Sequence, residues 1–414
     1  MMSNSDRIID PNPLARLESR RFDPLKWVVC ALLFALSYAL FYALCLRPSS
    51  DISIHATWAA EGDFRDLTSF LHHGAHPMWH ALVAVPLLFG IPLPVAAALI
   101  TALCKAAELL LIHRLFTLYL DRLLSRGAIT LLAAVCVMVS SLLVPGYNPT
   151  VYAGVGTPNT WHSCTQLIAM VWMLLCVPYT AHCYDGFLRR LPEQGEKTLL
   201  PWRKPVALGI MLFLSLLAKP TFMQAFLPAA CLFFLAMWIK HPKNGRFFCQ
   251  IILCVLPAVL FMIVQYLYYF GIIVPSQGDM VLEISLDKLK NVAVNTLLIQ
   301  AFPIYVLIAY RRWGKPDTFF WLALIFDIVG VLEFLILGES GRRAADGNFG
   351  WGMMGAALMM WVVAMIRFAS AVRQERTKDG RLRPQHITGT LLLGWHLVSG
   401  VYYIAYLFTS GSSL

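Results

Sequence analysis

An aspartate and a histidine, Asp51 and His55, follow a run of twenty uncharged residues that extends from Trp27 to Leu46. A carboxylate in this position can take a proton from a hydroxyl group, and an imidazole one helical turn further on can orient the carboxylate. A helix-ending aspartate and a polar histidine on a surface helix are the ordinary alternatives. Asp51 is therefore a candidate general base, with His55 as its candidate partner.

Three basic residues stand where an unpaired charge is costly or unexpected. Lys219 lies between two apolar runs in LLAKPTFMQAFLPA, and Arg342 and Arg343 form a pair in GESGRRAADGNFGWG. Cations fixed in such places can stabilise a departing phosphate, and guanidinium groups suit phosphate oxygens. The alternatives are that Lys219 extends to the membrane surface and that the arginines pair with Glu339 or Asp346. The favoured interpretation is a phosphate-binding set.

Two polar and aromatic motifs could contact a sugar. The motif TPNTWHS contains Asn159, Trp161 and His162, and GNFGWG contains Asn348 and Trp351. Amide and imidazole groups bond to hydroxyls, and indole rings cover the apolar faces of sugars. Tryptophan is also enriched at membrane interfaces in general. We expect these five residues to bind sugar or acceptor, with an interfacial role as the alternative.

A metal site is possible but disfavoured. Imidazole and carboxylate ligands suit zinc or manganese, and four histidines could join Asp51 in holding a divalent ion: His72, His73, His76 and His80. Gly74 and Pro77 interrupt any helix that would place them on one face. No CxxC pair is present among the ten cysteines. No metal ligand set and no certain cofactor are therefore expected.

The composition places these residues in a membrane protein. Of the 414 residues 58% are hydrophobic and only 14% are charged, with a mean hydropathy of +0.65. That leaves too little polar surface to cover a water-soluble globule. A span requires about 20 apolar residues. The expected fold is all-α and polytopic, with about eleven spans: 27–46, 95–117, 128–144, 165–182, 205–218, 221–239, 248–270, 291–309, 318–337, 350–367 and 387–409.

The basic residues predict the orientation. Residues 76–94 are barely long enough to cross and contain Pro86. Because counting them as a span would put the later basic loops on the wrong sides, we place them in the outer interface. With that placement, 24 of the 33 Lys and Arg residues lie in inner segments, as the positive-inside rule requires. The N-terminus is then cytoplasmic and the C-terminus lies outside, in an inner (plasma) membrane. The net charge of +10 reflects topology, and no nucleic-acid partner is expected.

The predicted domain organisation is simple. Residues 1–26 form a cytoplasmic N-terminal segment, and 27–414 form one membrane domain whose first outer loop is 47–94. Within this loop an interfacial helix is expected from the helical spacing of Phe64, Leu67 and Leu71. A second surface helix is expected to begin near Pro77.

This arrangement resembles the GT-C glycosyltransferases that use polyprenyl-phosphate sugars, a superfamily that includes protein O-mannosyltransferases and the aminoarabinose transferase of lipid A. Asp51 matches the acidic residue near the start of the first outer loop, and Lys219 with Pro220 matches a Lys-Gly or Lys-Pro step between later spans. TPNTWHS and GRRAADGNFGWG look like stretches found in uncharacterised bacterial membrane proteins of this type. Residues 145–164 contain no acid, whereas many members have a second acidic residue there. Metal dependence is correspondingly in doubt.

The resemblance implies transfer of a sugar from a polyprenyl-phosphate donor on the outer side, by a single displacement that inverts configuration. The lipid bilayer and the donor are the expected partners, and the acceptor and oligomeric state stay open. A flippase or other transporter and a polymerase of lipid-linked sugars are the alternatives.

Four charged residues lie inside the predicted spans. Lys105 and Glu108, three residues apart, are expected to pair across a helical turn. Asp327 and Glu333 must face protein or a cavity. Glu333 is a secondary candidate for the missing acid, and a transporter would need several of these charges.

Overall fold

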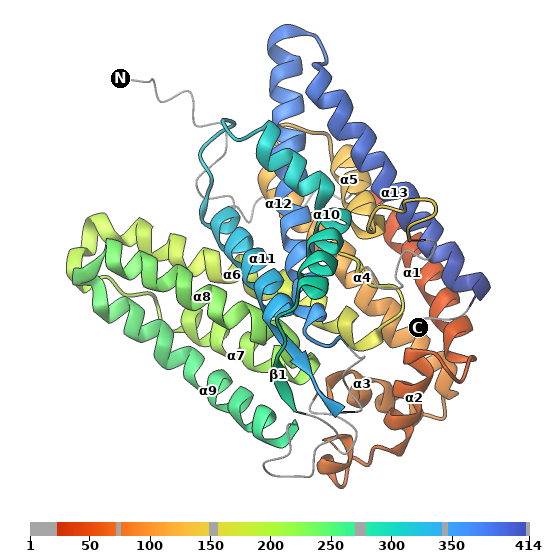
Figure 1. Ribbon diagram of the computed structural model, residues 1–414. Coiled ribbons are helices and arrows are strands. Elements are labelled where there is room, and N and C mark those ends of the chain that lie inside the picture. Colours follow the sequence, from red (N-terminus) through yellow and green to blue (C-terminus); the bar gives the residue numbers. More distant parts are fainter. Residues whose placement is uncertain (1–22, 72–75, 149–155, 270–278, 342–346, 411–414) are drawn as a thin grey trace.

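The computed structural model is almost entirely helical (Figure 1). It describes residues 23–71, 76–148, 156–269, 279–341 and 347–410. The α-helices are α1 Pro24–Cys45, α2 Asp51–Glu61, α3 Met78–Leu87, α4 Leu93–Leu120, α5 Arg126–Met138, α6 Cys164–Gln194, α7 Arg203–Ala218, α8 Pro220–Lys240, α9 Gly245–Tyr269, α10 Leu286–Ala309, α11 Thr318–Ile336, α12 Gly350–Asp379 and α13 Pro384–Ser410. Three short 3-10 turns complete the helical elements: Leu67–Leu71, Gly195–Lys197 and Pro242–Asn244.

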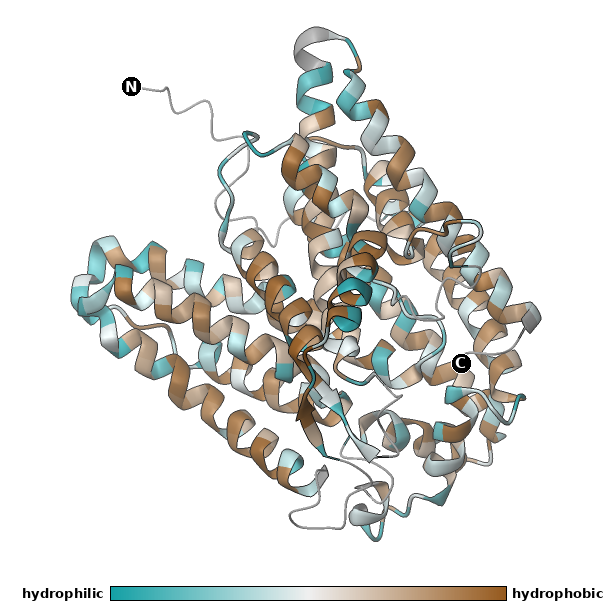
Figure 2. Ribbon diagram, in the orientation of Figure 1, coloured by the Kyte–Doolittle hydropathy of each residue, from teal (hydrophilic) through white to brown (hydrophobic). Residues whose placement is uncertain are grey.

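The helices agree with a protein that crosses a membrane many times. Within the described residues, nine helices are long and apolar enough to span a bilayer. Helices α5 and α7 overlap two further predicted spans, 128–144 and 205–218, but they have only 13 and 16 residues. The interfacial segment 76–94 contains α3, which has only ten residues. Brown apolar residues cover most of the long helices in Figure 2.

Helix α12 forms the centre of the molecule. In its most apolar stretch 89% of the residues are buried, the largest share among the candidate spans of the described chain. It packs against α8, α10 and α11, whereas α1 packs against α4. Helices α6 to α9 form the green wing in Figure 1. The turn from α12 to α13 lies at one end of the molecule, and α2 and α3 lie toward the other.

The first loop differs from its predicted layout. The first helix of this loop is α2, which begins at Asp51 and ends at Glu61, and Phe64 lies beyond it in a turn. The 3-10 turn Leu67–Leu71 follows. Ser50 caps α2, because its side-chain oxygen accepts a hydrogen bond from Ser53 N at 3.2 Å. This cap fixes the start of the helix at Asp51. The single helix expected from Phe64 to Leu71 does not form, because Phe64 lies in a turn and only Leu67–Leu71 are helical, as a short 3-10 element. The second helix, α3, begins after Pro77 as predicted.

One small sheet interrupts the all-α architecture. Strand β1, Met280–Leu282, pairs antiparallel with β2, Leu337–Glu339. Lys288 strengthens this connection, because its Nζ donates to Glu283 Oε2 and to Leu337 O, each at 2.7 Å. The pair joins the start of α10 to the end of α11, next to the segment that leads into α12.

Candidate functional site

Four helix N-termini meet in one region below the centre of the molecule. Asp51 is the first residue of α2, Cys164 the first of α6, and Lys219 the residue that precedes α8. Trp351 lies in the first turn of α12. Each N-terminus leaves backbone N–H groups without helical partners and carries a partial positive charge. They favour an anionic ligand, although the C-terminus of α7, which ends at Ala218 beside Lys219, offsets part of this charge.

Asp51 and His55 face each other across the first turn of α2. Asp51 Oδ1 lies 3.6 Å from His55 Nε2, and the Asp51 side chain is one-third exposed. The other ring nitrogen, His55 Nδ1, lies 2.9 Å from Nε2 of His80 on α3. Burial lowers the pKa of His55 well below its ordinary value, and His80 and Lys219 add to the effect. His55 is therefore neutral at physiological pH.

Lys219 is the buried cation of the region. Only 7% of the Lys219 surface is exposed, and Lys219 Nζ lies 4.0 Å from the ring centroid of Trp351. Burial lowers the pKa of Lys219 from 10.5 to about 8, while the negative charge of Asp51 acts in the opposite direction. The Asp51 carboxylate is thus near enough to influence the ammonium. The structure brings the predicted base and the predicted cation into one neighbourhood.

His162 is a further member of the same neighbourhood. Its Nδ1 forms a short hydrogen bond with the hydroxyl of Tyr403 on α13, and its ring lies 5.7 Å from that of Trp351. Burial lowers the pKa of His162 to about 4, and the nearby Asp51 charge opposes this. A neutral imidazole in this position can bond to hydroxyl groups but adds no permanent charge.

A cavity of about 250 Å³ opens beside Lys219. Its walls come from α8, the end of α9 and the segment before α12, and they include Pro220, Thr221, Met262, Ile263, Tyr266 and Phe349. The polar groups in it come from His76, Lys219, Gln224, Gln265, Glu339 and Asn348. Ile263 and Tyr266 are also exposed on the outer surface of α9. The cavity thus joins a cation to an apolar surface.

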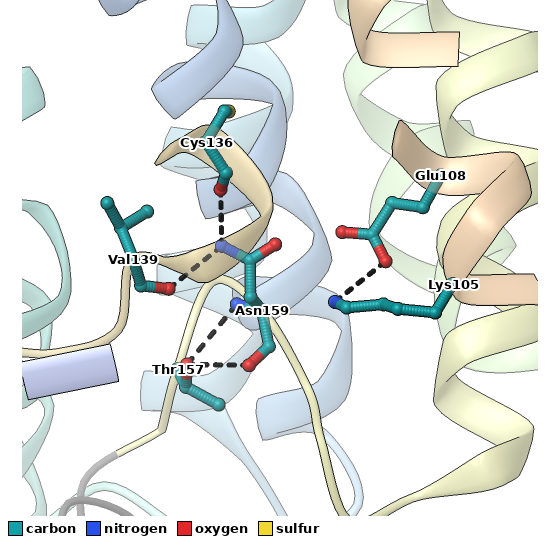
Figure 3. A network of polar contacts seen from close by, with 6 residues as sticks. All are labelled: Lys105, Glu108, Cys136, Val139, Thr157 and Asn159. Carbon is teal, nitrogen blue, oxygen red and sulfur yellow. Dashed lines mark hydrogen bonds and ion pairs between the residues drawn. The ribbon is translucent and has the colours of Figure 1, made fainter. Parts of the chain in front are cut away.

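Asn159 and Trp161 make contacts within the protein, and Figure 3 shows those of Asn159. The amide nitrogen of Asn159 donates to the carbonyl oxygens of Cys136 at 2.7 Å and Val139 at 2.9 Å, holding the end of α5. The ring of Trp161 lies 4.4 Å from the ammonium of Lys105. Both residues are almost fully buried. Their contacts within the protein give a structural reason for their presence.

The expected pairing of Lys105 with Glu108 is confirmed. Lys105 Nζ donates to Glu108 Oε2 at 2.9 Å, and both side chains are fully buried. Figure 3 shows the pair beside the Asn159 network. A buried pair of this kind is costly to break, because the remaining partner would be an uncompensated charge.

Three predicted binding residues remain: Arg342, Arg343 and Asn348. Arg342 and Arg343, like His72 and His73, lie outside the described residues. Asn348 donates from Nδ2 to Glu339 Oε2 at 2.7 Å, so these two groups form one polar wall of the cavity.

Two intramembrane acids have different surroundings. Asp327 Oδ1 accepts a bond from Gln300 Nε2 at 2.7 Å. Glu333 lies against the start of α12, because a Cβ added to Gly352 would be only 3.1 Å from Glu333 Oε2. The absent side chain at Gly352 therefore allows Glu333 and α8 to approach the helix that carries Trp351.

Sequence reasoning missed Cys164, Glu339 and Tyr403 as neighbours of the site. Cys164 follows the TPNTWHS motif directly, two residues after His162. Its place in the sequence could therefore have identified it as a candidate. Tyr403 lies 241 residues from His162 in a regular apolar helix, and nothing local distinguishes it.

Comparison with known proteins adds no relative. No protein-family model matches the chain, and no curated protein matches it significantly. The function must therefore be argued from the site itself.

Proposed function

We propose that the protein is an integral-membrane glycosyltransferase that moves a sugar from a polyprenyl-phosphate donor to an acceptor at the extracytoplasmic surface. The observation that carries this proposal is the cavity in which Lys219 faces apolar walls. A lipid phosphate has the matching chemistry, since it combines a dianionic or monoanionic head group with a hydrocarbon tail. The exposed apolar residues of α9 offer the tail a lateral entrance from the bilayer.

Electrostatics at the cavity supports a phosphate ligand. Lys219 supplies a full charge where water is largely excluded, and the N-termini of α8 and α12 add partial positive charge. Charge stabilisation is stronger in such a setting than in water. We propose that Arg342 and Arg343, which precede α12 in sequence, contribute to holding the phosphate.

The proposed reaction is a single displacement. The acceptor hydroxyl gives its proton to Asp51 while its oxygen bonds to the anomeric carbon. The bond between that carbon and the phosphate oxygen breaks, and the electron pair leaves with the lipid phosphate, next to Lys219. Because the attack and departure occur on opposite faces of the sugar, configuration is inverted.

His55, His162 and Trp351 have supporting roles in this proposal. His55 Nε2 lies 3.6 Å from Asp51 Oδ1, one helical turn away, within reach of an acceptor held by that carboxylate. His162 and the Trp351 ring lie close to each other and offer a hydrogen-bonding group and an apolar face to the sugar.

The extracytoplasmic placement rests on charge. The opposite end of the molecule carries the connections that follow α4, α10 and α12. The basic residues of 118–127, 310–317 and 367–386 lie in these connections or in the adjoining parts of the helices. Positive loops favour the cytoplasmic side, so the site is proposed to face outward. The N-terminus would then be cytoplasmic and the C-terminus outside.

The transporter alternative receives less support from the described residues. A carrier that couples transport to intramembrane charge requires groups that can change partners. Lys105 and Glu108 are instead paired and inaccessible. A polymerase of lipid-linked sugars would use the same chemistry with a larger acceptor.

The test is donor consumption by the purified full-length protein, measured with a panel of polyprenyl-phosphate sugars and candidate hydroxyl acceptors. Asp51→Asn is compared with Glu61→Gln, an acid-to-amide change at the other end of the same helix. We expect the wild type and Glu61→Gln to consume a donor and Asp51→Asn to lose about 10²-fold or more in rate. Equal consumption by Asp51→Asn, or no consumption of any donor by the wild type, would contradict the proposal.

A further inference from the structure

Three potential metal ligands face one another at the start of α2 and α6. Ligand atoms of Asp51, His55 and Cys164 all lie within 4.8 Å of one another. They represent the three ligand types found most often at zinc: carboxylate oxygen, imidazole nitrogen and thiolate sulfur. Sequence analysis considered histidines of the first loop with Asp51, but it did not include His55 or Cys164.

The distance between Asp51 and His55 is informative. Oδ1 and Nε2 are 3.6 Å apart, which is too long for a hydrogen bond. In a tetrahedral zinc site with ordinary bond lengths, neighbouring ligand atoms are about 3.3 to 3.6 Å apart. The carboxylate and imidazole therefore already have the spacing of two ligands of one ion. The sulfur would need to approach by no more than about 1.3 Å to complete the triangle.

His80 provides a second, independent observation. A metal-binding histidine usually donates its other ring N–H to a neighbouring acceptor, which fixes the tautomer and aims the lone pair at the ion. His55 Nδ1 lies 2.9 Å from His80 Nε2. With the proton on His55 Nδ1, this contact is a normal hydrogen bond, and the Nε2 lone pair faces Asp51 and Cys164.

Charge balance also fits a divalent cation. A carboxylate and a thiolate together carry two negative charges, which neutralise such an ion in a buried setting. The Cys164 residue is 0% exposed, where a thiolate without a cation would be costly. Binding therefore displaces the thiol proton to solvent, and no electron transfer is involved.

We propose that Asp51, His55 and Cys164 form a binding site for a thiophilic divalent metal ion of the zinc type, with His80 as the positioning residue for His55. Three protein ligands leave one tetrahedral position open, as in catalytic zinc sites. Lys219 and His162 belong to the same neighbourhood, since the Asp51 charge acts on both. If the transferase proposal holds, the acceptor hydroxyl takes the open position and loses its proton more readily, and Asp51 Oδ2 remains available to receive it.

The experiment uses purified full-length protein that is stripped with a chelator and loaded with Co²⁺, a spectroscopic substitute for zinc. Neither donor nor acceptor is added. We expect about one tightly bound ion per chain and a thiolate-to-cobalt charge-transfer band. Cys164→Ser should lose the band and bind the ion at least tenfold more weakly. Cys176→Ser is the matched control, because Cys176 is equally buried in the same helix and should retain both.

A second variant separates the ligand from its positioning residue. His80→Phe removes the acceptor of His55 Nδ1 and should weaken Co²⁺ affinity by about 10- to 100-fold while the band persists. Wild-type protein without a stoichiometric ion, or Cys164→Ser with an unchanged band, would overturn the proposal. Protein that binds Co²⁺ as expected but consumes no donor would contradict the transferase proposal alone.

Discussion

Replacing Lys219 by methionine tests whether the buried ammonium holds the phosphate of a donor. The change keeps an unbranched side chain of similar length and removes the charge. Lowering the pKa from 10.5 to about 8 corresponds to a cost of about 3 kcal/mol for charging Lys219 in the empty cavity. A bound phosphate would repay that cost, since opposite charges about 4 Å apart gain about 4 kcal/mol near a protein surface.

The expected effect is a loss of about 2 to 4 kcal/mol of transition-state stabilisation, or roughly 30- to 1,000-fold in kcat/KM. Lys290→Met is the matched control: Lys290 lies on α10, and its side chain is 75% exposed. It should retain the wild-type rate. The assay is initial-rate donor consumption at several donor concentrations. Wild-type kcat/KM in Lys219→Met would refute the phosphate role of Lys219.

The pH dependence follows from the same residue. Lys219 is charged below its pKa of about 8 and neutral above it, so kcat/KM should decline as the pH rises through about 8. Arginine stays charged throughout this range. Lys219→Arg should therefore lack the alkaline decline, even if its larger head group lowers the maximum rate. A decline that is identical in Lys219→Arg would assign the titration to another group.

Three further predictions concern the scaffold. A Cβ at Gly400 would lie 1.6 Å from the carbonyl oxygen of Met138, whereas one at Gly394 meets nothing within 4 Å. Gly400→Ala should therefore lower the free energy of unfolding by about 1 to 3 kcal/mol, and Gly394→Ala should leave it unchanged. Unfolding in detergent measures both. Glu108→Gln should destabilise by about 3 to 5 kcal/mol by leaving Lys105 uncompensated, and the double variant Lys105→Met with Glu108→Leu should recover part of that loss in the same unfolding assay. Asn159→Ala should cost about 1 to 3 kcal/mol by leaving the Cys136 and Val139 carbonyls without their donor; an unchanged unfolding midpoint with a raised KM would instead favour sugar binding by Asn159.

The apolar runs of the sequence predicted the long helices well, because a membrane-spanning segment must satisfy its own backbone hydrogen bonds. The distribution of basic residues argued against 76–94 as a span, and Pro77 marked the start of α3. The first loop was predicted less well. Phe64 and Leu67 have helical spacing, but the cap at Ser50 begins the helix earlier and α2 ends at Glu61.

The neighbourhood of Asp51 and Lys219 could be anticipated from their types and from the side of the membrane. Their neighbours could not. Tyr403 reaches His162 from α13, and Cys164 becomes a neighbour of Asp51 because α6 starts beside α2. Such contacts depend on how helices pack, which the spacing along one helix does not encode. The role of Asn159 was similarly hidden, since its partners are backbone carbonyls about twenty residues away.

The central claim is that Asp51 and Lys219 act on one lipid-phosphate ligand in different ways. The most direct measurement is the equilibrium affinity of metal-stripped, full-length protein for a polyprenyl phosphate that carries no sugar. We predict that Lys219→Met weakens binding at least tenfold, while Asp51→Asn binds as tightly as the wild type or more tightly, because it removes a negative charge near the phosphate. Equal affinity in the wild type and Lys219→Met would contradict the claim.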